Sequence, residues 1–300
     1  MALRKAFLCF LLAGFLAFTI QIFFSSPISL DTLELPTASP FLLPINNQLQ
    51  KVIKLGEGLL KDPDDVCVDE EGTLIQQLGM VGLEGGLIVC DSEKGLLKVG
   101  EDGVTVLVSH VNGSKLRFAD DVIEASDGGL YFSVASTKFE LHNWYLDVLE
   151  AKPHGQLIKY DPSSNETSVV LDKLAFANGV ALSKEEDYLV ICETWTYRCL
   201  KYWLNRVKKG ETEIFIENLP GAPDNINLAP DGSFWIALFQ LTSDGRFVHT
   251  SKVFKHLVAS SPRLIKLMNG VYRKAMVVNV AADGKIIRKF DDPNGKVITL

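Results

Sequence analysis

Acidic or amide side chains stand at the start of four apolar segments that are far apart along the chain. The four dipeptides are Asp64-Asp65, Asp120-Asp121, Asn178-Gly179 and Asp224-Asn225. Carboxylate and amide oxygens, without accompanying His or Cys, suit a hard cation such as Ca²⁺, which takes about 6–8 oxygen ligands. Such an ion could polarise a carbonyl or phosphoryl oxygen of a small substrate. The alternative is that these residues cap strand ends and satisfy backbone amides.

Other catalytic signatures are absent from the sequence. The chain has no GxSxG elbow, no HExxH and no GxxxxGK[ST] loop, and its five cysteines show no CxxC spacing that would predict zinc. His142 and His154 are candidate acid–base groups, with a purely structural role as the alternative.

The elements that position the four dipeptides form an internal repeat. Each copy has a small residue or proline, the dipeptide, an apolar strand, an acidic turn and a second apolar strand. The copies begin at Asp62, Phe118, Phe176 and Ala222, with a weaker fifth copy from Val277. Asp-Gly dipeptides between such apolar runs predict hairpins. All-β units repeated at this spacing predict propeller blades, whose inner strand ends would converge on a central channel.

Two stretches depart from the β pattern, residues 138–155 and 251–274, where the apolar spacing is helix-like. We expect 138–155 to form a lid over the channel mouth. The polar positions of 251–274 are basic. The stretch is interpreted as a solvated helix packed over one end of the propeller, with contact to an anionic membrane as the alternative.

The N-terminus predicts entry into the secretory pathway. Arg4 and Lys5 precede an apolar run from Ala6 to Phe24. Roughly 19 helical residues reach about 28 Å, close to the bilayer core of about 30 Å. We interpret residues 1–24 as an uncleaved signal-anchor, with a cleaved signal peptide as the alternative, residues 25–50 as a linker and residues 51–300 as the propeller domain. The charges before the span would place that domain in the lumen.

Sequons and cysteines fit a lumenal address in the ER or vacuole, or a place at the cell surface. Asn112 and Asn165 begin Asn-x-Ser/Thr triplets in turn-like stretches and are predicted glycosylation sites. Cys192 and Cys199 could form a cross-hairpin disulfide or simply pack between strands. The net charge of -7 argues against a nucleic-acid partner. The expected partners are a small-molecule substrate and, through the N-terminal segment, a membrane.

Five segments together resemble the strictosidine synthase-like proteins of plants and their animal relative, adipocyte plasma membrane-associated protein. They are GEGLLKDPDDVCVD, RFADDVIEASDGGLYFSVASTKF, HGQLIKYDPSSNET, FANGVALSKEEDYLVICET and LPGAPDNINLAPDGSFWIAL. The resemblance runs from about residue 52 to 297. It implies an all-β, six-bladed β-propeller behind the N-terminal apolar helix. It also implies a superfamily shared with paraoxonases and gluconolactonases, which are calcium-dependent hydrolases of esters and lactones.

The resemblance also implies a ligand set. Asn178 matches a metal-binding asparagine, Asp224 and Asn225 match metal-binding residues, Asp120 stands where paraoxonases have asparagine, and Asp64 stands where glutamate is usual. We therefore expect a membrane-anchored, lumenal hydrolase of small esters or lactones that uses Ca²⁺. Amine–aldehyde condensation of the strictosidine synthase type is one alternative, and a non-catalytic ligand-binding propeller is another.

The chain departs from the family in length. Residues 72–86 read GTLIQQLGMVGLEGG, where relatives carry most of a blade. The glutamate that strictosidine synthases use in the last blade would fall beyond Leu300. We therefore predict a propeller about one and a half blades short, with sheet edges left open, and do not expect strictosidine synthase activity.

Overall fold

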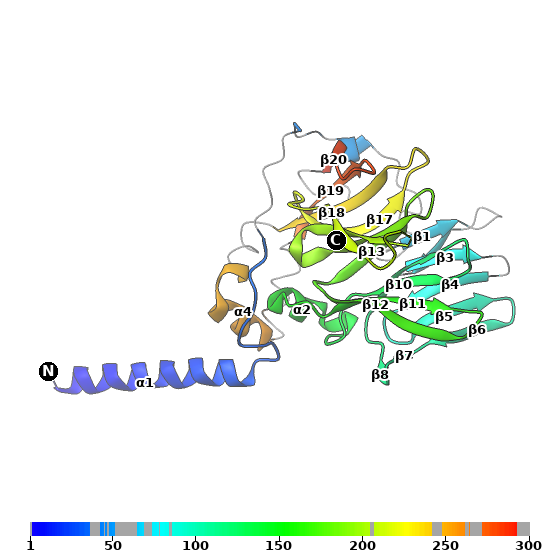
Figure 1. Cartoon of the computed structure of the whole chain (residues 1–300). Helices are drawn as coiled ribbons and strands as arrows, with labels where there is room; N and C mark the ends of the chain where they lie inside the picture. Colours follow the sequence, from blue (N-terminus) through cyan, green and yellow to red (C-terminus); the bar gives the residue numbers. More distant parts are fainter. Residues whose placement is uncertain are drawn as a thin grey trace.

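The computed structural model of the chain describes residues 2–36, 43–44, 46, 48–51, 65–68, 74–77, 79–83, 86–204, 207–241, 248–261, 264 and 272–292. Four four-stranded antiparallel sheets fill most of this part of the chain, each built from strands consecutive in sequence (Figure 1). Their strands are β3 (Gly79–Leu83), β4 (Gly86–Asp91), β5 (Gly95–Gly100) and β6 (Gly103–Val108); β9 (Ala119–Glu124), β10 (Leu130–Val134), β11 (Gly155–Asp161) and β12 (Glu166–Leu174); β13 (Ala177–Leu182), β14 (Tyr188–Glu193), β15 (Arg198–Trp203) and β16 (Thr212–Ile216); β17 (Ala222–Leu228), β18 (Phe234–Leu241), β19 (Tyr272–Val280) and β20 (Ile286–Asp292).

Two short hairpins complete the described strands. Strands β1 (Asp65–Val68) and β2 (Leu74–Gln77) pair only with each other, and so do β7 (His110–Val111) and β8 (Ser114–Lys115). The β1–β2 hairpin is half a blade, and β3 begins two residues after it. Within the described residues, four sheets and this hairpin make four and a half blades, which confirms the predicted incomplete propeller.

The hairpin turns form where the Asp-Gly dipeptides predict them. Gly103, Gly128, Gly232 and Gly284 all have positive φ. Glycine adopts this conformation without the steric penalty that a Cβ imposes. The dipeptide at Asp244 lies outside the described residues.

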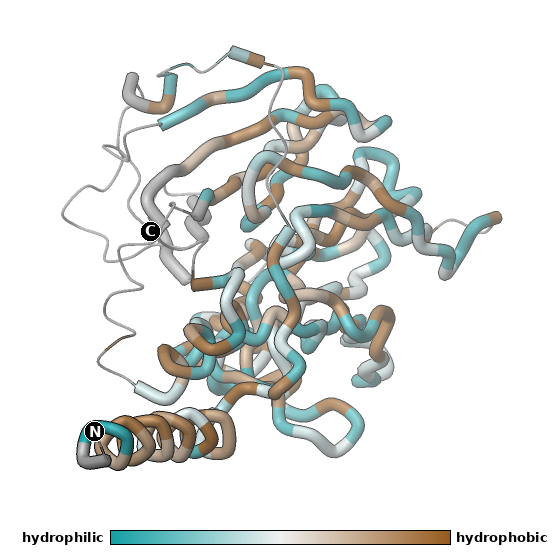
Figure 2. Tube along the Cα trace, turned by 90° about the vertical axis from the view of Figure 1, so that its left-hand side faces the viewer, coloured by the Kyte–Doolittle hydropathy of each residue, from teal (hydrophilic) through white to brown (hydrophobic). Residues whose placement is uncertain are grey.

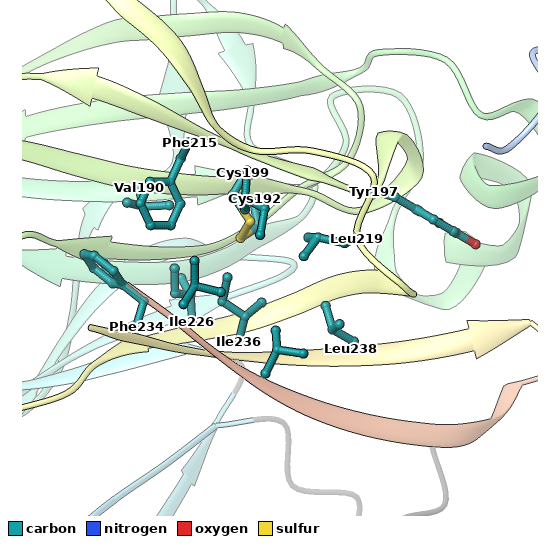
Figure 3. Close-up of a cluster of buried hydrophobic side chains, with 14 of the residues drawn as sticks. Val190, Cys192, Tyr197, Cys199, Phe215, Leu219, Ile226, Phe234, Ile236 and Leu238 are labelled. Carbon is teal, nitrogen blue, oxygen red and sulfur yellow. A yellow bond between two sulfur atoms is a disulfide. The ribbon is translucent and has the colours of Figure 1, made fainter. Parts of the chain in front are cut away.

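Each pair of neighbouring blades buries its own apolar cluster. The one between the third and fourth four-stranded sheets is shown in Figure 3, where Val190 and Phe215 face Ile226, Phe234 and Ile236. Fully burying one such side chain stabilises the fold by about 1.5–3 kcal/mol. Because these clusters lie between blades, they hold the inner strands in position around the channel.

Cys192 and Cys199 lie directly opposite each other on β14 and β15 and form a disulfide. From the sequence, either a disulfide or simple packing between strands was possible for this pair. Both cysteines are also part of the apolar cluster in Figure 3.

One predicted repeat is wrong. The fifth copy, from Val277, does not start a blade, because β19 and β20 are the outer two strands of the sheet that begins with β17. In this sheet both halves have an apolar strand, an Asp-Gly turn and a second apolar strand. The pattern therefore cannot separate the inner half from the outer half.

The helices lie at one end of the blades. Helix α2 (Trp144–Glu150), preceded by the 3-10 turn η2 (Leu141–Asn143), and helix α4 (Lys252–Ala259) pack together with η3 (Thr194–Thr196). We call α2, α4 and η3 the cap. The helical prediction for 251–274 is wrong at its end, since β19 begins at Tyr272.

Helix α1 (Ala2–Ser25) extends away from the blades (Figure 1). Its residues 4–25 are long and apolar enough to cross a membrane, and none of the span is buried by the rest of the chain. Figure 2 shows this helix mostly brown, whereas the strands alternate between brown and teal. A signal sequence meets the same criteria as a membrane anchor.

Candidate functional site

Three of the four dipeptides lie on the first, innermost strand of a four-stranded sheet. Asp120 is the second residue of β9, Asn178 is the second residue of β13, and Asp224 is the third residue of β17. Strand β9 packs beside β13, and β13 packs beside β17. The three inner strands therefore lie next to one another in chain order. Asp64 lies outside the described residues.

Asn178 and Asp224, two of the predicted metal ligands, contact each other directly. The Asn178 side-chain amide donates a hydrogen bond of 2.7 Å to Oδ1 of Asp224. Burial raises the pKa of the Asp224 carboxyl to about 6, and the bond from Asn178 offsets only part of that effect. Asp224 is thus a half-buried carboxyl whose described hydrogen-bond partner is a neutral amide, which is an environment that a cation would stabilise.

Asp121, which the sequence did not single out, links two blades. Its Oδ2 accepts a 2.8 Å bond from the Val180 amide on β13, and its Oδ1 accepts a 2.8 Å bond from the Val122 amide. Ser133 Oγ accepts a bond from the Asp121 amide. Asp121 therefore satisfies backbone amides, as predicted if these residues cap strand ends. Its bond to Val180 also holds β13 against β9 near Asn178. Nothing in the spacing of the Asp-Asp pair distinguishes its two residues.

Glycine lets the inner strands approach each other. A Cβ at Gly179 would lie 2.5 Å from the Ile226 amide nitrogen and 2.7 Å from the Asp224 carbonyl oxygen. A Cβ at Gly79 on β3 would lie 2.4 Å from the Asp121 Cα. The glycine that follows Asn178 is therefore a spacer, and it sets the distance between the two strands that carry the Asn178–Asp224 pair.

The donor chemistry of this site fits a hard cation. Asp120 is buried on β9, and with Asn178 and Asp224 it offers only oxygen ligands. Asn225, the other predicted ligand described on β17, lines the cavity that lies toward the far ends of these strands. No group of three His, Cys, Asp or Glu side chains suited to a metal occurs within the described ranges. A site here would therefore draw part of its ligands from amide oxygens.

A cavity of about 280 Å³ lies between the same inner strands, toward their C-terminal ends. Its walls include Ile123, Leu182 and Asn227. Residues just before the inner strands, Phe118 and Phe176, pack in the cap instead. The strand starts therefore face the cap, and the cavity lies toward the opposite end of the channel.

The two candidate histidines lie in or beside the cap. His154 Nε2 is 2.8 Å from Glu150 Oε1, and its ring packs against Phe139. His142 is exposed and stands 3.5 Å from Glu140. These contacts are with Glu150 on α2 and with Phe139 and Glu140 shortly before it, and not with Asn178 or Asp224. Their acid–base role stays a prediction.

A buried acidic pair lies inside the cap. Trp195 Nε1 donates a 2.8 Å bond to Asp147, and burial raises the pKa of this carboxyl to about 6. Glu150 is also buried, but its pKa is lowered to about 2, since bonds from His154, Lys138 and Ser29 together outweigh the effect of burial. The cap helix, which lies in the stretch predicted as a lid, thus contains one carboxyl whose pKa is raised and one whose pKa is lowered.

The two sequons occupy exposed turns. Asn112 lies between β7 and β8, and Asn165 lies between β11 and β12, both with positive φ. Asn165 Oδ1 accepts a bond from the Tyr160 hydroxyl. A glycan at either position stays a prediction.

Comparisons with known proteins identify a family model and several relatives that this chain resembles. The family model described as strictosidine synthase matches residues 120–207. Adipocyte plasma membrane-associated protein of Rattus norvegicus is 32% identical over 266 residues, covering 85% of this chain and 69% of the relative. Protein STRICTOSIDINE SYNTHASE-LIKE 6 of Arabidopsis thaliana is 37% identical over 218 residues, covering 61% of this chain. This chain spans 58% of the length of that relative.

Among solved structures, a gluconolactonase from Xanthomonas campestris is similar in fold, with a TM-score of 0.50. It is 17% identical, and the match covers 76% of this chain and 69% of that chain. The likeness supports the propeller-type architecture.

Proposed function

The chain belongs to the strictosidine synthase-like family, and on that premise we propose that it is a membrane-anchored propeller of the secretory pathway that binds Ca²⁺ and hydrolyses small esters or lactones. The observation that carries the proposal is the Asn178–Asp224 pair on neighbouring inner strands, with a half-buried carboxyl whose pKa is raised.

Asp120, Asn178, Asp224 and Asn225 would hold the ion, with Asp64 as a further ligand. Bound there, Ca²⁺ would act as a Lewis acid toward a substrate carbonyl. Asp121 and Gly179 would fix the spacing of the strands that carry these ligands. The cap would exclude bulk water from the strand starts, because Phe118 and Phe176 pack beneath it.

Thermal unfolding of the full chain in detergent, with Ca²⁺ and with excess chelator, tests the metal site. A ligand that binds only the folded state raises Tm by mass action. We expect Ca²⁺ to raise Tm and Asp224→Asn to abolish the rise. Asp231→Asn is the matched control, because Asp231 lies in the exposed turn of the same hairpin, between β17 and β18. A calcium shift retained in Asp224→Asn would refute the site.

Hydrolysis is tested with aryl-ester and lactone panels on the same proteins. Turnover that depends on Ca²⁺ and on Asp224, and not on Asp231, is the expected result. The alternative activity is amine–aldehyde condensation of the strictosidine synthase type, which the matching family model supports. A product assay with tryptamine and secologanin tests it.

The anchor part of the proposal rests on α1. Arg4 and Lys5 at its start would stay cytosolic, and the propeller would enter the lumen of the ER or vacuole or reach the cell surface. We expect the protein to stay in the membrane pellet after washing with alkaline carbonate. Release by that wash would refute the anchor.

A non-catalytic binding propeller is the second candidate, and the cavity at the far end of the channel favours it. Its volume of about 280 Å³ is close to the lower limit for small-molecule sites. A cooperative unfolding transition whose Tm does not change with Ca²⁺, together with no ester or lactone turnover, would favour this candidate over hydrolysis.

A further inference from the structure

The segment directly after α1 is bonded to the cap along its length. Ser26 Oγ lies 2.8 Å from His256 Nδ1 on α4. The Ser29 amide and hydroxyl both donate bonds of 2.9 Å to the buried Glu150 carboxylate on α2. The Leu33 amide donates a 2.9 Å bond to the Glu150 carbonyl. Residues 26–33 therefore join the apolar helix to the cap as a docked strap.

Helix α1 itself reaches α4. The Phe23 and His256 rings pack with their centroids 4.5 Å apart, and α4 lies beside the C-terminal end of α1 (Figure 1). Phe23 belongs to the last turn of the helix, which ends at Ser25. Since Ser26 is already bonded to α4, the spacing between the end of the span and the cap is fixed.

Four large apolar side chains are exposed around this junction. Leu30 is 61% exposed and Leu33 48% on the strap, and Val253 is 50% and Phe254 40% exposed on α4. We call these four residues the apolar collar. The two segments that carry them are in contact, because Lys255 on α4 donates a bond to the Leu33 carbonyl.

The face of α4 toward α1 carries part of the apolar collar. Residues three and four apart share one side of a helix. Val253 and Lys252 therefore lie on the same side as His256, which contacts Phe23 and Ser26. Lys252 is exposed there. Segments that lie at a membrane interface combine exposed apolar residues with lysines whose stems lie along the apolar surface.

We propose that the apolar collar lies in the interfacial layer of the bilayer that α1 spans, so that the cap end of the propeller faces the membrane. The inference rests on the proposed anchor, because α1 brings the collar to the lipid. Apolar faces of interfacial helices enter about 5–10 Å into the headgroup and acyl boundary, and α4 is packed against the last turn of the span at that level. The cavity at the other end of the channel then opens away from the membrane.

Photo-crosslinking in vesicles tests the inference with the full chain. A diazirine side chain replaces Val253 in one protein and Val104 in a second, in vesicles of phosphatidylcholine with a minor share of phosphatidylserine. Val104 is the matched control, since it is also a valine, 62% exposed, on the outermost strand of a blade. Mass spectrometry of the irradiated peptides counts the lipid adducts.

We expect lipid adducts at position 253 and only background at 104. Background at both positions, in a protein that resists carbonate washing, would overturn the collar and leave the anchor standing. Adducts at 253 to a second copy of the chain instead of lipid would also overturn it. Release by carbonate would overturn the anchor, and the collar with it.

Discussion

Replacing Gly179 by alanine inserts a methyl group between β13 and β17, at the point where these strands carry Asn178 and Asp224. The new Cβ would lie 2.5 Å from the Ile226 nitrogen, 2.7 Å from the Asp224 oxygen and 2.8 Å from the Asn225 Cα. All three are backbone atoms, so no side chain can rotate out of the way. The strands must separate by roughly 0.9 Å to reach an ordinary contact of 3.4 Å.

The expected cost follows from this clash. Overpacking a well-packed interior costs about 1–3 kcal/mol, and a clash with three backbone atoms belongs at the upper end of that range. Alanine recovers about 0.4–1 kcal/mol by restricting the unfolded chain. The net loss in the free energy of unfolding is about 2 kcal/mol. For a domain of this size that loss lowers Tm by about 4–8 °C.

The assay is thermal and urea unfolding of the full chain in detergent, followed by a Ca²⁺ titration. Gly82→Ala is the control, because a Cβ there meets only the Leu87 side chain at 3.9 Å. We expect Gly179→Ala to lose stability and to bind Ca²⁺ more weakly. Gly82→Ala should gain about 0.4–1 kcal/mol of stability and bind Ca²⁺ like the wild type. If Gly179→Ala unfolds like Gly82→Ala, the reasoning that glycine spaces these strands is refuted.

Three further predictions concern the buried charges and the disulfide. Burial raises the pKa of Asp224 to about 6, so the folded state binds its proton more tightly than the unfolded state does. The free energy of unfolding of the calcium-free protein should therefore fall as pH rises from about 4 to 6. Asp224→Asn should flatten this slope in urea unfolding, and an unchanged slope would contradict the assignment. Glu150→Gln removes a buried carboxylate bonded to Ser29, His154 and Lys138 and should cost about 1–3 kcal/mol, because Lys138 stays partly exposed to water. The same variant should speed protease cleavage within residues 26–36, and wild-type cleavage would show that Glu150 does not hold the strap. Reducing the Cys192–Cys199 disulfide, which closes a short loop, should cost about 2–3 kcal/mol, and an unfolding curve indifferent to reductant would contradict this.

Much of the fold could be predicted because its signals are local. The Asp-Gly turns at Asp127 and Asp231 fix hairpins through positive φ at the following glycines. The alternation of apolar residues sets strand faces, and the repeat of dipeptide, strand, turn and strand identifies blades. Between Gly72 and Gly86 the sequence is shorter than that of relatives, which predicted that part of a blade is missing. The β1–β2 hairpin, which has only two strands, confirms this prediction.

The candidate site could be predicted only in part. The sequence indicated that Asn178 and Asp224 meet, because each begins an inner strand, and the structure brings them to 2.7 Å. It could not separate Asp120 from Asp121, because both lie at the start of the same strand and differ only in the side of the strand they face. Which one bonds to Val180 depends on a neighbouring blade 59 residues away.

The sequence by itself determined the repeat, the strand pairing within blades, the apolar N-terminal helix and the oxygen-rich residue types at the strand starts. These features depend on residues that are close together in the sequence, so their spacing along the chain predicts them. Only the tertiary structure decided that Val277 continues a blade, that Gly179 is a spacer and that Ser29 bonds to Glu150 121 residues away. Those outcomes depend on which surfaces pack together, and hydrophobic periodicity does not specify the partner of a surface.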